Sequence, residues 1–179
     1  MPRIWTIGHS TRDSDAFVAA LHSHGVRALV DVRRFPGSRR HPQFNADTLG
    51  HTLLAAGIAY LGFGEELGGR RRPRPDSTNT VWRNAGFKGY ADYMETPAFA
   101  RALEHLLRLA HERPTAIMCA ELLWFRCHRA LIADALEAKG VEVIHIHGQE
   151  SGVRHPYTSA ARIVAGRLQY GTGAESERR

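Results

Sequence analysis

Cysteine is scarce in this chain, which has only Cys119 and Cys127 among its 179 residues. Small disulfide-stabilised domains carry more cysteines, and both thiols fall in segments typical of a buried strand and a helix start, so we expect reduced thiols. No apolar run reaches the roughly 18–20 residues that span a membrane. The N-terminus lacks the apolar stretch and cleavage site of a signal peptide, so we expect a cytoplasmic protein without a membrane span.

Acidic residues are fewer than basic ones. The chain has 18 Asp and Glu against 24 Lys and Arg, most of them arginine, and a formal net charge of +6. This excess favours an anionic partner such as nucleic acid, nucleotide or phosphate. Hydrophobic content of 43% and charged content of 23% are ordinary for a globular protein and exclude wholesale disorder or a fibrous class.

Short apolar runs alternate with helical patterns along the chain. One helix is expected to start at Ser10-Thr11-Arg12-Asp13 and end at Gly25, another to be capped by Asn45, and a third to start at Thr96-Pro97. The apolar runs between the helical patterns are residues 4–7, 28–32, 58–61, 115–119 and 141–146. This order predicts an α/β fold of three layers, Rossmann-like, with a mostly parallel sheet of about five strands and helices on both faces.

Two stretches do not follow this alternation. Residues 63–89 are rich in Gly, Pro and Arg, which predicts an irregular, mobile basic flap. The pattern also fades after residue 148. We therefore expect a single domain over residues 1–148 and a partly disordered C-terminal extension over 149–179, with a short element at 160–170 and a frayed tail from Gly171.

Polar residues follow the predicted strands, at the edge where ligands bind in open parallel sheets. Gly8 permits a tight turn, and the hydroxyls and helix-start amides after it suit a phosphate, although an ordinary capped turn is the alternative. The forks of Arg33 and Arg39 match anion oxygens, with a solvated basic loop as the alternative. The predicted anion-binding residues are Ser10, Thr11, Arg33, Ser38, Arg39, Arg129 and Tyr90, and the catalytic candidates are Asp31, Glu121, His9, Cys127 and His128.

Each catalytic candidate has a structural alternative. Asp31 ends an apolar strand, where a carboxylate either pairs with an Arg or His or acts as a base. We expect Glu121 to stand in the same relation to a later strand, held ionised by Arg126, His128 or Arg129.

Cys127 has cationic neighbours that lower a thiol pKa, but a small buried hydrophobe is the commoner role of a free cysteine. The seven residues between Cys119 and Cys127 do not match the Cys pairs of structural zinc sites. A three-ligand metal site that uses His9 or Glu121 stays open. The sequence identifies no cofactor.

The same segments resemble the DUF488 family, a domain of unknown function, over about residues 3–147. The resemblance implies a fold and a set of motifs but no chemistry. The motifs are Thr6-Ile7-Gly8-His9-Ser10-Thr11, Val30-Asp31-Val32-Arg33, Pro36-Gly37-Ser38-Arg39, Phe44-Asn45, Leu67-Gly68-Gly69, Phe87-Lys88-Gly89-Tyr90-Ala91-Asp92-Tyr93-Met94, Cys119-Ala120-Glu121 and Cys127-His128-Arg129.

Three functions stay open at this stage. The first is a hydrolase or transferase that acts on a nucleotide or nucleic acid, with Glu121 or Asp31 as base and arginines holding phosphate. The second is a non-catalytic module that binds nucleic acid or nucleotides through arginines and aromatic rings. The third is a metal- or thiol-dependent site around Cys119, Cys127 and His128.

Overall fold

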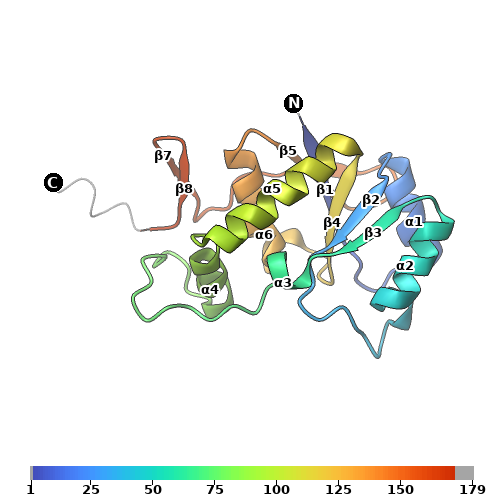
Figure 1. The fold of residues 1–179 in the computed structure, drawn as a ribbon, viewed down its shortest axis with the longest axis horizontal. Helices are drawn as coiled ribbons and strands as arrows, with labels where there is room; N and C mark the ends of the chain where they lie inside the picture. The colour runs from blue at the N-terminus through green and yellow to red at the C-terminus, as the bar shows by residue number, and fades with distance from the viewer. Residues whose placement is uncertain (1, 172–179) are drawn as a thin grey trace.

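The computed structural model describes residues 2–171 (Figure 1). Its strands are β1 (Arg3–Gly8), β2 (Ala28–Asp31), β3 (Ala59–Gly62), β4 (Thr115–Cys119), β5 (Glu142–Ile146), β6 (Gly152–Arg154), β7 (Arg162–Val164) and β8 (Arg167–Gln169). Its helices are α1 (Ser14–Ser23), α2 (Ala46–Ala55), α3 (Gly64–Leu67), α4 (Ala85–Tyr93), α5 (Pro97–Glu112) and α6 (Arg129–Ala138), with short 3-10 turns η1 (Pro42–Phe44) and η2 (Trp124–Arg126).

One sheet of six strands, in the order β3-β2-β4-β1-β5-β6, organises the fold. β1 to β5 are parallel, whereas β6 runs antiparallel to β5. The predicted mostly parallel α/β sheet is therefore confirmed. The sequence did not indicate β6, because its three exposed residues show no alternation of apolar and polar side chains.

Helices cover both faces of the sheet, as predicted. Phe17 of α1 and Leu53 of α2 pack with Ile7 in a buried cluster on one face. Leu103 of α5 and Leu131 of α6 belong to a second cluster on the other face. In Figure 1, α5 accordingly crosses one side of the sheet while α1 and α2 lie on the other. The adjacent strands β1 and β4 thus lead to helices on opposite faces, which makes their carboxyl ends a topological switch point.

The first helix begins later than the sequence predicts. Asp13 is its N-cap, and its Oδ1 accepts a hydrogen bond from the Ala16 amide at 2.7 Å. The amides of His9 and Ser10 instead donate to the carbonyls of Cys119 and Ala120, at 2.9 and 3.0 Å. The predicted helix start at Ser10 is therefore wrong, and these two amides are not free to bind an anion. The prediction for Asn45 is half right, because α2 starts there but its side chain accepts from Ser38 N rather than from the helix.

Helices α3 and α4 occupy both ends of the stretch predicted as a flap, residues 63–89. The irregular part between them is held by Asp92 of α4, which is 3% exposed. Its carboxylate accepts from Arg74 N at 2.7 Å, Ser77 Oγ at 2.6 Å and Asn79 Nδ2 at 2.7 Å. The mobility of this segment stays a prediction.

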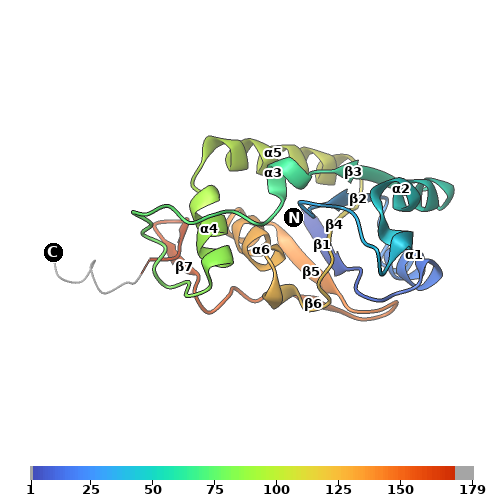
Figure 2. The ribbon, with the colours of Figure 1, turned by 90° about the horizontal axis from the view of Figure 1, so that it is seen from below.

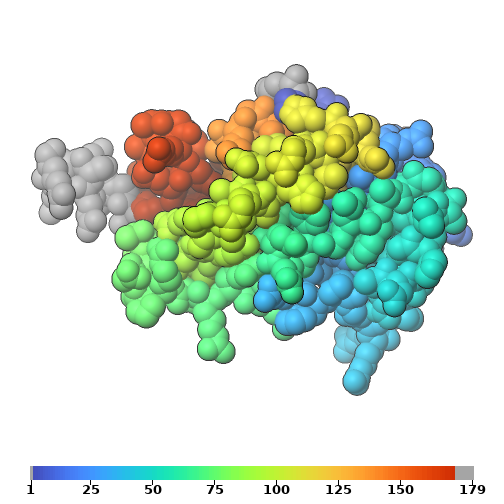
Figure 3. All heavy atoms as spheres, in the orientation of Figure 1, coloured from blue at the N-terminus to red at the C-terminus, as the bar shows by residue number. Residues whose placement is uncertain are grey.

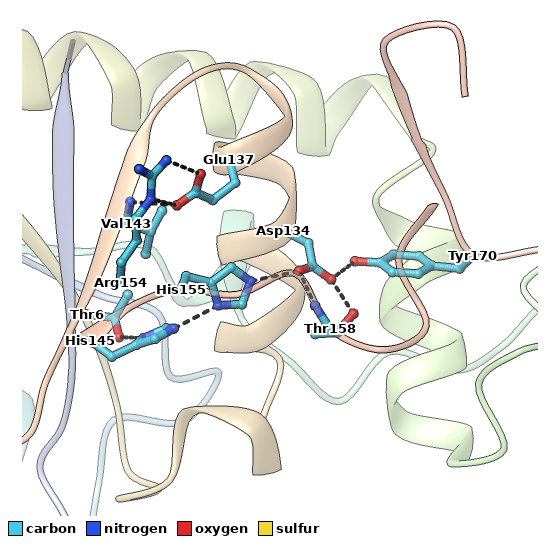
Figure 4. A network of polar contacts seen from close by, with 9 residues as sticks. All are labelled: Thr6, Asp134, Glu137, Val143, His145, Arg154, His155, Thr158 and Tyr170. Atoms are coloured by element: carbon cyan, nitrogen blue, oxygen red, sulfur yellow. Dashed lines mark hydrogen bonds and ion pairs between the residues drawn. The ribbon is translucent and has the colours of Figure 1, made fainter. Parts of the chain in front are cut away.

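The C-terminal segment returns to α6. The element expected at 160–170 is the hairpin of β7 and β8. Asp134 of α6 accepts from His155 Nε2 at 2.7 Å and from Tyr170 Oη at 2.7 Å, so one buried carboxylate ties two parts of this segment to the helix (Figure 4). The tail predicted beyond Gly171 lies outside the described residues. Between residues 2 and 171, no helix is both long and apolar enough to cross a membrane.

Candidate functional site

A pocket of about 580 Å³ lies beyond the carboxyl ends of β1, β2 and β4. Figure 2 shows the molecule from below, the side on which the blue loop between β2 and α2 lies in Figure 1. The residues that line the pocket are His9, Ser10, Thr11, Arg33, Arg34, Phe35, Gly37, Ser38, His41, Gly69, Arg70, Cys119, Ala120, Glu121, Leu122, Cys127 and His128.

The wall of this pocket between β1 and β4 is formed by backbone packed on backbone. A Cβ atom at Gly8 would lie 1.8 Å from the carbonyl oxygen of Glu121, so only glycine fits there. Ser10, two residues on, has a φ of 49°, in the left-handed region that non-glycine residues rarely adopt. The loop after β1 is therefore held against the loop after β4. These two loops follow the carboxyl ends of β1 and β4, where the topological switch point lies.

Asp31 is a structural partner of Arg33. Arg33 Nε donates to Asp31 Oδ1 at 2.9 Å and Nη2 to Oδ2 at 2.7 Å, and the hydroxyl of Tyr60 donates to Oδ2 at 2.6 Å. Asp31 is 1% exposed and does not line the pocket. Arg33 and Tyr60 donate to both oxygens of the Asp31 carboxylate. Asp31 is therefore poorly suited to act as a base.

His9 is held as a neutral ring. Its Nδ1 lies 2.9 Å from the Ser10 carbonyl, which only accepts, so Nδ1 carries the proton. Its Nε2 then accepts from Arg33 Nη1 at 3.3 Å. Burial lowers the pKa of His9 to about 4, and the nearby charge of Arg33 acts in the same direction. Both ring nitrogens are engaged, so His9 positions the neighbouring groups and has no free lone pair.

The two cysteines lie together on the pocket wall. Cys119 ends β4, Cys127 precedes α6, and their sulfur atoms are 3.1 Å apart, with both residues free. Burial alone would raise the pKa of the Cys119 thiol, but a hydrogen bond from Cys127 and the charge of Arg129 outweigh it and lower this pKa to about 7. The same hydrogen bond and burial raise the pKa of Cys127. These pKa directions favour Cys119 as the thiolate of the pair, while the contact itself is compatible with either sulfur as the donor.

Arg129 places a buried positive charge next to these thiols. It is 2% exposed, and its Nη2 donates to the carbonyls of Glu121 at 3.3 Å and Leu122 at 3.1 Å. Within the part of the chain that the structure describes, its Nε and Nη1 have no hydrogen-bond partner and it makes no ion pair with a carboxylate. A buried cation without a carboxylate favours an anion beside it, and the charge of Arg129 lowers the pKa of both cysteine thiols.

His128 supplies a free ring nitrogen. Its Nε2 donates to the Val32 carbonyl at 2.8 Å, so Nδ1 carries no proton. Burial lowers its pKa to about 4. Gly69 leaves space for this ring, because a Cβ there would lie 3.0 Å from Nδ1. Neutral His128 can therefore accept a hydrogen bond through Nδ1.

The rim of the pocket is more basic than acidic. Arg70 is exposed and its guanidinium lies 5.4 Å from the ring centroid of Phe35, which is 65% exposed. Arg34 and His41 add two further basic groups, and Glu121 is the one acidic residue of the lining within the described chain. Figure 3 shows the blue loop after β2 projecting from the lower side of the molecule. An anionic ligand suits this rim better than a cationic one.

The structure brings together most of the predicted site residues. Those that line the pocket are His9, Ser10, Thr11, Arg33, Ser38, Glu121, Cys127 and His128. The other predicted residues do not line it: Asp31 is held by Arg33, Arg129 is buried, Arg39 is exposed on the loop after β2, and the buried Tyr90 donates to the Leu67 carbonyl at 2.7 Å.

Two expectations need correction. Glu121 is exposed, and Arg129 contacts its carbonyl rather than its carboxylate, because the chain turns its backbone inward at this loop. The three-ligand metal site is not supported, since the described residues contain no group of three or more His, Cys, Asp or Glu side chains able to hold a metal ion. The sequence named Cys119 only as part of a metal- or thiol-dependent alternative with Cys127 and His128, and the structure places it in the pocket lining.

A larger cavity of about 1020 Å³ lies elsewhere, between α4, α5, α6 and β8. Leu103 and Ala135 belong to its lining, and none of the motif residues of the strand ends does. The smaller pocket is therefore the candidate site, because it contains the thiols and the switch point.

Comparison with known proteins gives one match. The family model described as "Domain of unknown function DUF488" matches residues 13–136. No curated protein and no solved structure matches the chain. The matched range includes both cysteines and Arg129, whereas Gly8, His9 and Ser10 lie just before it.

Proposed function

Because the chain belongs to the DUF488 family, whose description assigns no activity, we propose a function from the chemistry of the pocket. The protein is a thiol-dependent transferase or hydrolase for a small anionic substrate, and Cys119 is its nucleophile. The observation that carries this proposal is the 3.1 Å contact between the sulfur atoms of Cys119 and Cys127 in the pocket wall.

The surroundings of Cys119 support a nucleophilic role. Thiolates rather than thiols attack electrophiles, and this one is favoured by the hydrogen bond from Cys127 and by the cation of Arg129. The proton-free Nδ1 of His128 is available to accept a hydrogen bond from an incoming second substrate such as water. Arg34 and Arg70 at the rim favour a substrate that carries phosphate or carboxylate groups.

The test is alkylation by iodoacetamide as a function of pH, with the modified residue identified by peptide mass spectrometry. We expect the Cys119 rate to rise with a midpoint near pH 7, well below the value of about 8.5 for a free thiol. Arg129→Gln should move the midpoint upward, because it removes the cation. Arg126→Gln, at an exposed position of η2, is the matched control and should leave it unchanged.

A wild-type midpoint near that of a free thiol, or faster alkylation of Cys127 than of Cys119, would contradict the proposal. This conclusion does not depend on the folding of any variant, since it needs the wild-type protein alone.

A second candidate function is the binding of nucleic acid by the exposed arginines around the pocket. Arg39, Arg40, Arg70 and Arg72 are exposed, and the ring of Phe35 offers a surface for base stacking. Affinity for a generic single-stranded oligonucleotide should fall steeply as salt rises. Binding that is absent at low salt would remove this candidate.

A further inference from the structure

We propose that Cys119 and Cys127 form a thiol–disulfide exchange couple that reduces small disulfides and is itself converted into an internal disulfide. This inference rests on the proposed nucleophilic role of Cys119 and adds a reaction and a class of co-substrate. It starts from the placement of the two sulfur atoms, 3.1 Å apart on separate elements of one pocket.

The geometry requires little movement to form the bond. A disulfide has a sulfur–sulfur distance of about 2.05 Å, so the sulfur atoms need to approach by about 1 Å. Cys119 is fixed at the end of β4, whereas Cys127 lies at the end of a loop and turn that precede α6. Cys127 is also the more exposed of the two. We therefore expect Cys127 to move when the bond forms.

The electrostatics gives each cysteine one role. Cys119 attacks first, because its thiol pKa is lowered while that of Cys127 is raised. The hydrogen bond to Cys119 keeps the Cys127 thiol protonated. Once Cys119 is part of a mixed disulfide, this hydrogen bond to a thiolate is gone, and the Cys127 thiol loses its proton more easily. It then becomes the resolving thiol.

The reaction has two balanced steps. The Cys119 thiolate attacks one sulfur of a small disulfide RSSR, the bond between the two RSSR sulfurs breaks, and RS⁻ leaves while a mixed disulfide forms on Cys119. Cys127 then gives up its proton and attacks Cys119 Sγ, which releases the second RS⁻. The two cysteines lose two electrons in total, and RSSR gains them. One RS⁻ takes the proton from Cys127 and becomes a thiol, and the other RS⁻ remains a thiolate or takes a proton from water.

The pocket limits the size of the co-substrate. Cys119 is only 3% exposed, so the attacking atom is reached from within a pocket of about 580 Å³ rather than from the open surface. A small disulfide can enter such a pocket, whereas the residues at the rim would prevent the disulfide of a folded protein domain from reaching the Cys119 sulfur. 2-Hydroxyethyl disulfide is accordingly a suitable probe.

The experiment treats the reduced full-length protein with 2-hydroxyethyl disulfide at pH 7.5 and measures its intact mass without reductant. We expect the wild-type protein to lose two hydrogen atoms, with no adduct, and peptide mapping to show a Cys119–Cys127 link. Cys127→Ser, which keeps a hydroxyl donor, should stop at a mixed disulfide on Cys119. Cys119→Ser should react at least about tenfold more slowly than the wild-type protein, because the thiol that remains has a raised pKa.

The outcomes separate this inference from the proposed function. A stable mixed disulfide on Cys119 of the wild-type protein, without an internal disulfide, would overturn the exchange couple and leave the nucleophile in place. A wild-type protein whose Cys119 reacts no faster than a thiol of the urea-unfolded chain would overturn both. The wild-type result decides either case, and thermal melting of the two serine variants shows whether their rates refer to folded protein.

Discussion

A buried carboxylate costs free energy unless it is paired, and Asp31 meets that requirement with Arg33 and Tyr60. The same residues leave Arg33 facing the pocket, where its Nη1 also donates to His9. The ion pair with Asp31 therefore holds Arg33 in the pocket, and Arg33 in turn favours the tautomer of His9 in which Nε2 carries no proton. Arg129 contrasts with this arrangement, because its partners are carbonyl groups and the field of its charge falls on Cys119.

Asp31→Asn should lower the free energy of unfolding by about 3–5 kcal/mol, because it leaves Arg33 buried without its counter-charge. Urea unfolding followed by circular dichroism measures this change. Glu142→Gln is the matched control. It breaks the more exposed pair with Arg3 and should cost at most about 1 kcal/mol. Equal losses for the two variants would show that Asp31 and Arg33 do not form the buried pair described above.

The candidate site is formed by the carboxyl ends of strands, among them β1 and β4, and by the loops that follow them. β1 and β4 lie side by side in register, with Gly8 opposite Cys119. The loops that follow them continue this pairing through the amides of His9 and Ser10. α1 and α6 then leave on opposite faces, which opens the space that the pocket occupies.

Gly8→Ala tests this contact between the two loops. The added Cβ meets the backbone of Glu121 at 1.8 Å, so the loops must separate, and we expect a loss of at least about 1–3 kcal/mol with a lower melting temperature. Gly62→Ala at the end of β3 is the control, since a Cβ there meets nothing within 4 Å. A Gly8→Ala protein as stable as the Gly62→Ala protein would refute the close approach of the loops.

Buried histidines connect distant parts of the molecule through hydrogen bonds. A hydrogen bond of 2.8 Å joins Nε2 of His145, on β5, to Nδ1 of His155, and His155 contacts Asp134 of α6 (Figure 4). A hydrogen bond of 2.5 Å also joins His145 to the hydroxyl of Thr6 on β1, so this chain of hydrogen bonds joins the sheet, α6 and the C-terminal segment. Burial lowers the pKa of His145 to about 2. His9 and His128, near the pocket, have pKa values lowered to about 4 for the same reason.

These lowered pKa values predict that the protein loses stability as the pH falls below about 6.5. In the unfolded chain each histidine takes up a proton near that pH, whereas in the folded protein His9, His128 and His145 stay neutral until the pH is much lower. Each histidine therefore removes about 1.4 kcal/mol per pH unit once the pH is well below 6.5.

Urea unfolding at pH 7.5, 6.5 and 5.5 measures this loss before most carboxylates titrate. His9→Gln should make the dependence on pH shallower by about one proton, and His51→Gln, at an exposed position of α2, should not change it. Stability that is constant between pH 7.5 and 5.5 would contradict the burial of these rings as neutral groups.

The sequence by itself determined the five parallel strands, the main helices and the edge of the sheet at which the candidate site lies. Apolar periodicity predicted the five parallel strands and the main helices, because it reports which side chains of a segment are buried. Gly25 was correctly predicted to end a helix, and its φ is positive, 73°. Since parallel strands end at one edge, the motif residues that follow them were expected there, and most of them line one pocket.

Only the tertiary structure decided which of these residues are free to react. The strand order places β1 beside β4. As a result, the amides expected to bind an anion, those of His9 and Ser10, donate instead to carbonyl groups of Cys119 and of the loop after β4. Asp31 was neutralised by Arg33, whereas the chain turned the Glu121 carboxylate outward and left Arg129 beside Cys119. Periodicity carries information on burial within a segment, but the partner of a buried charge or thiol depends on how separate loops pack against each other. The pairing of Cys119 with Cys127 therefore had to come from the fold.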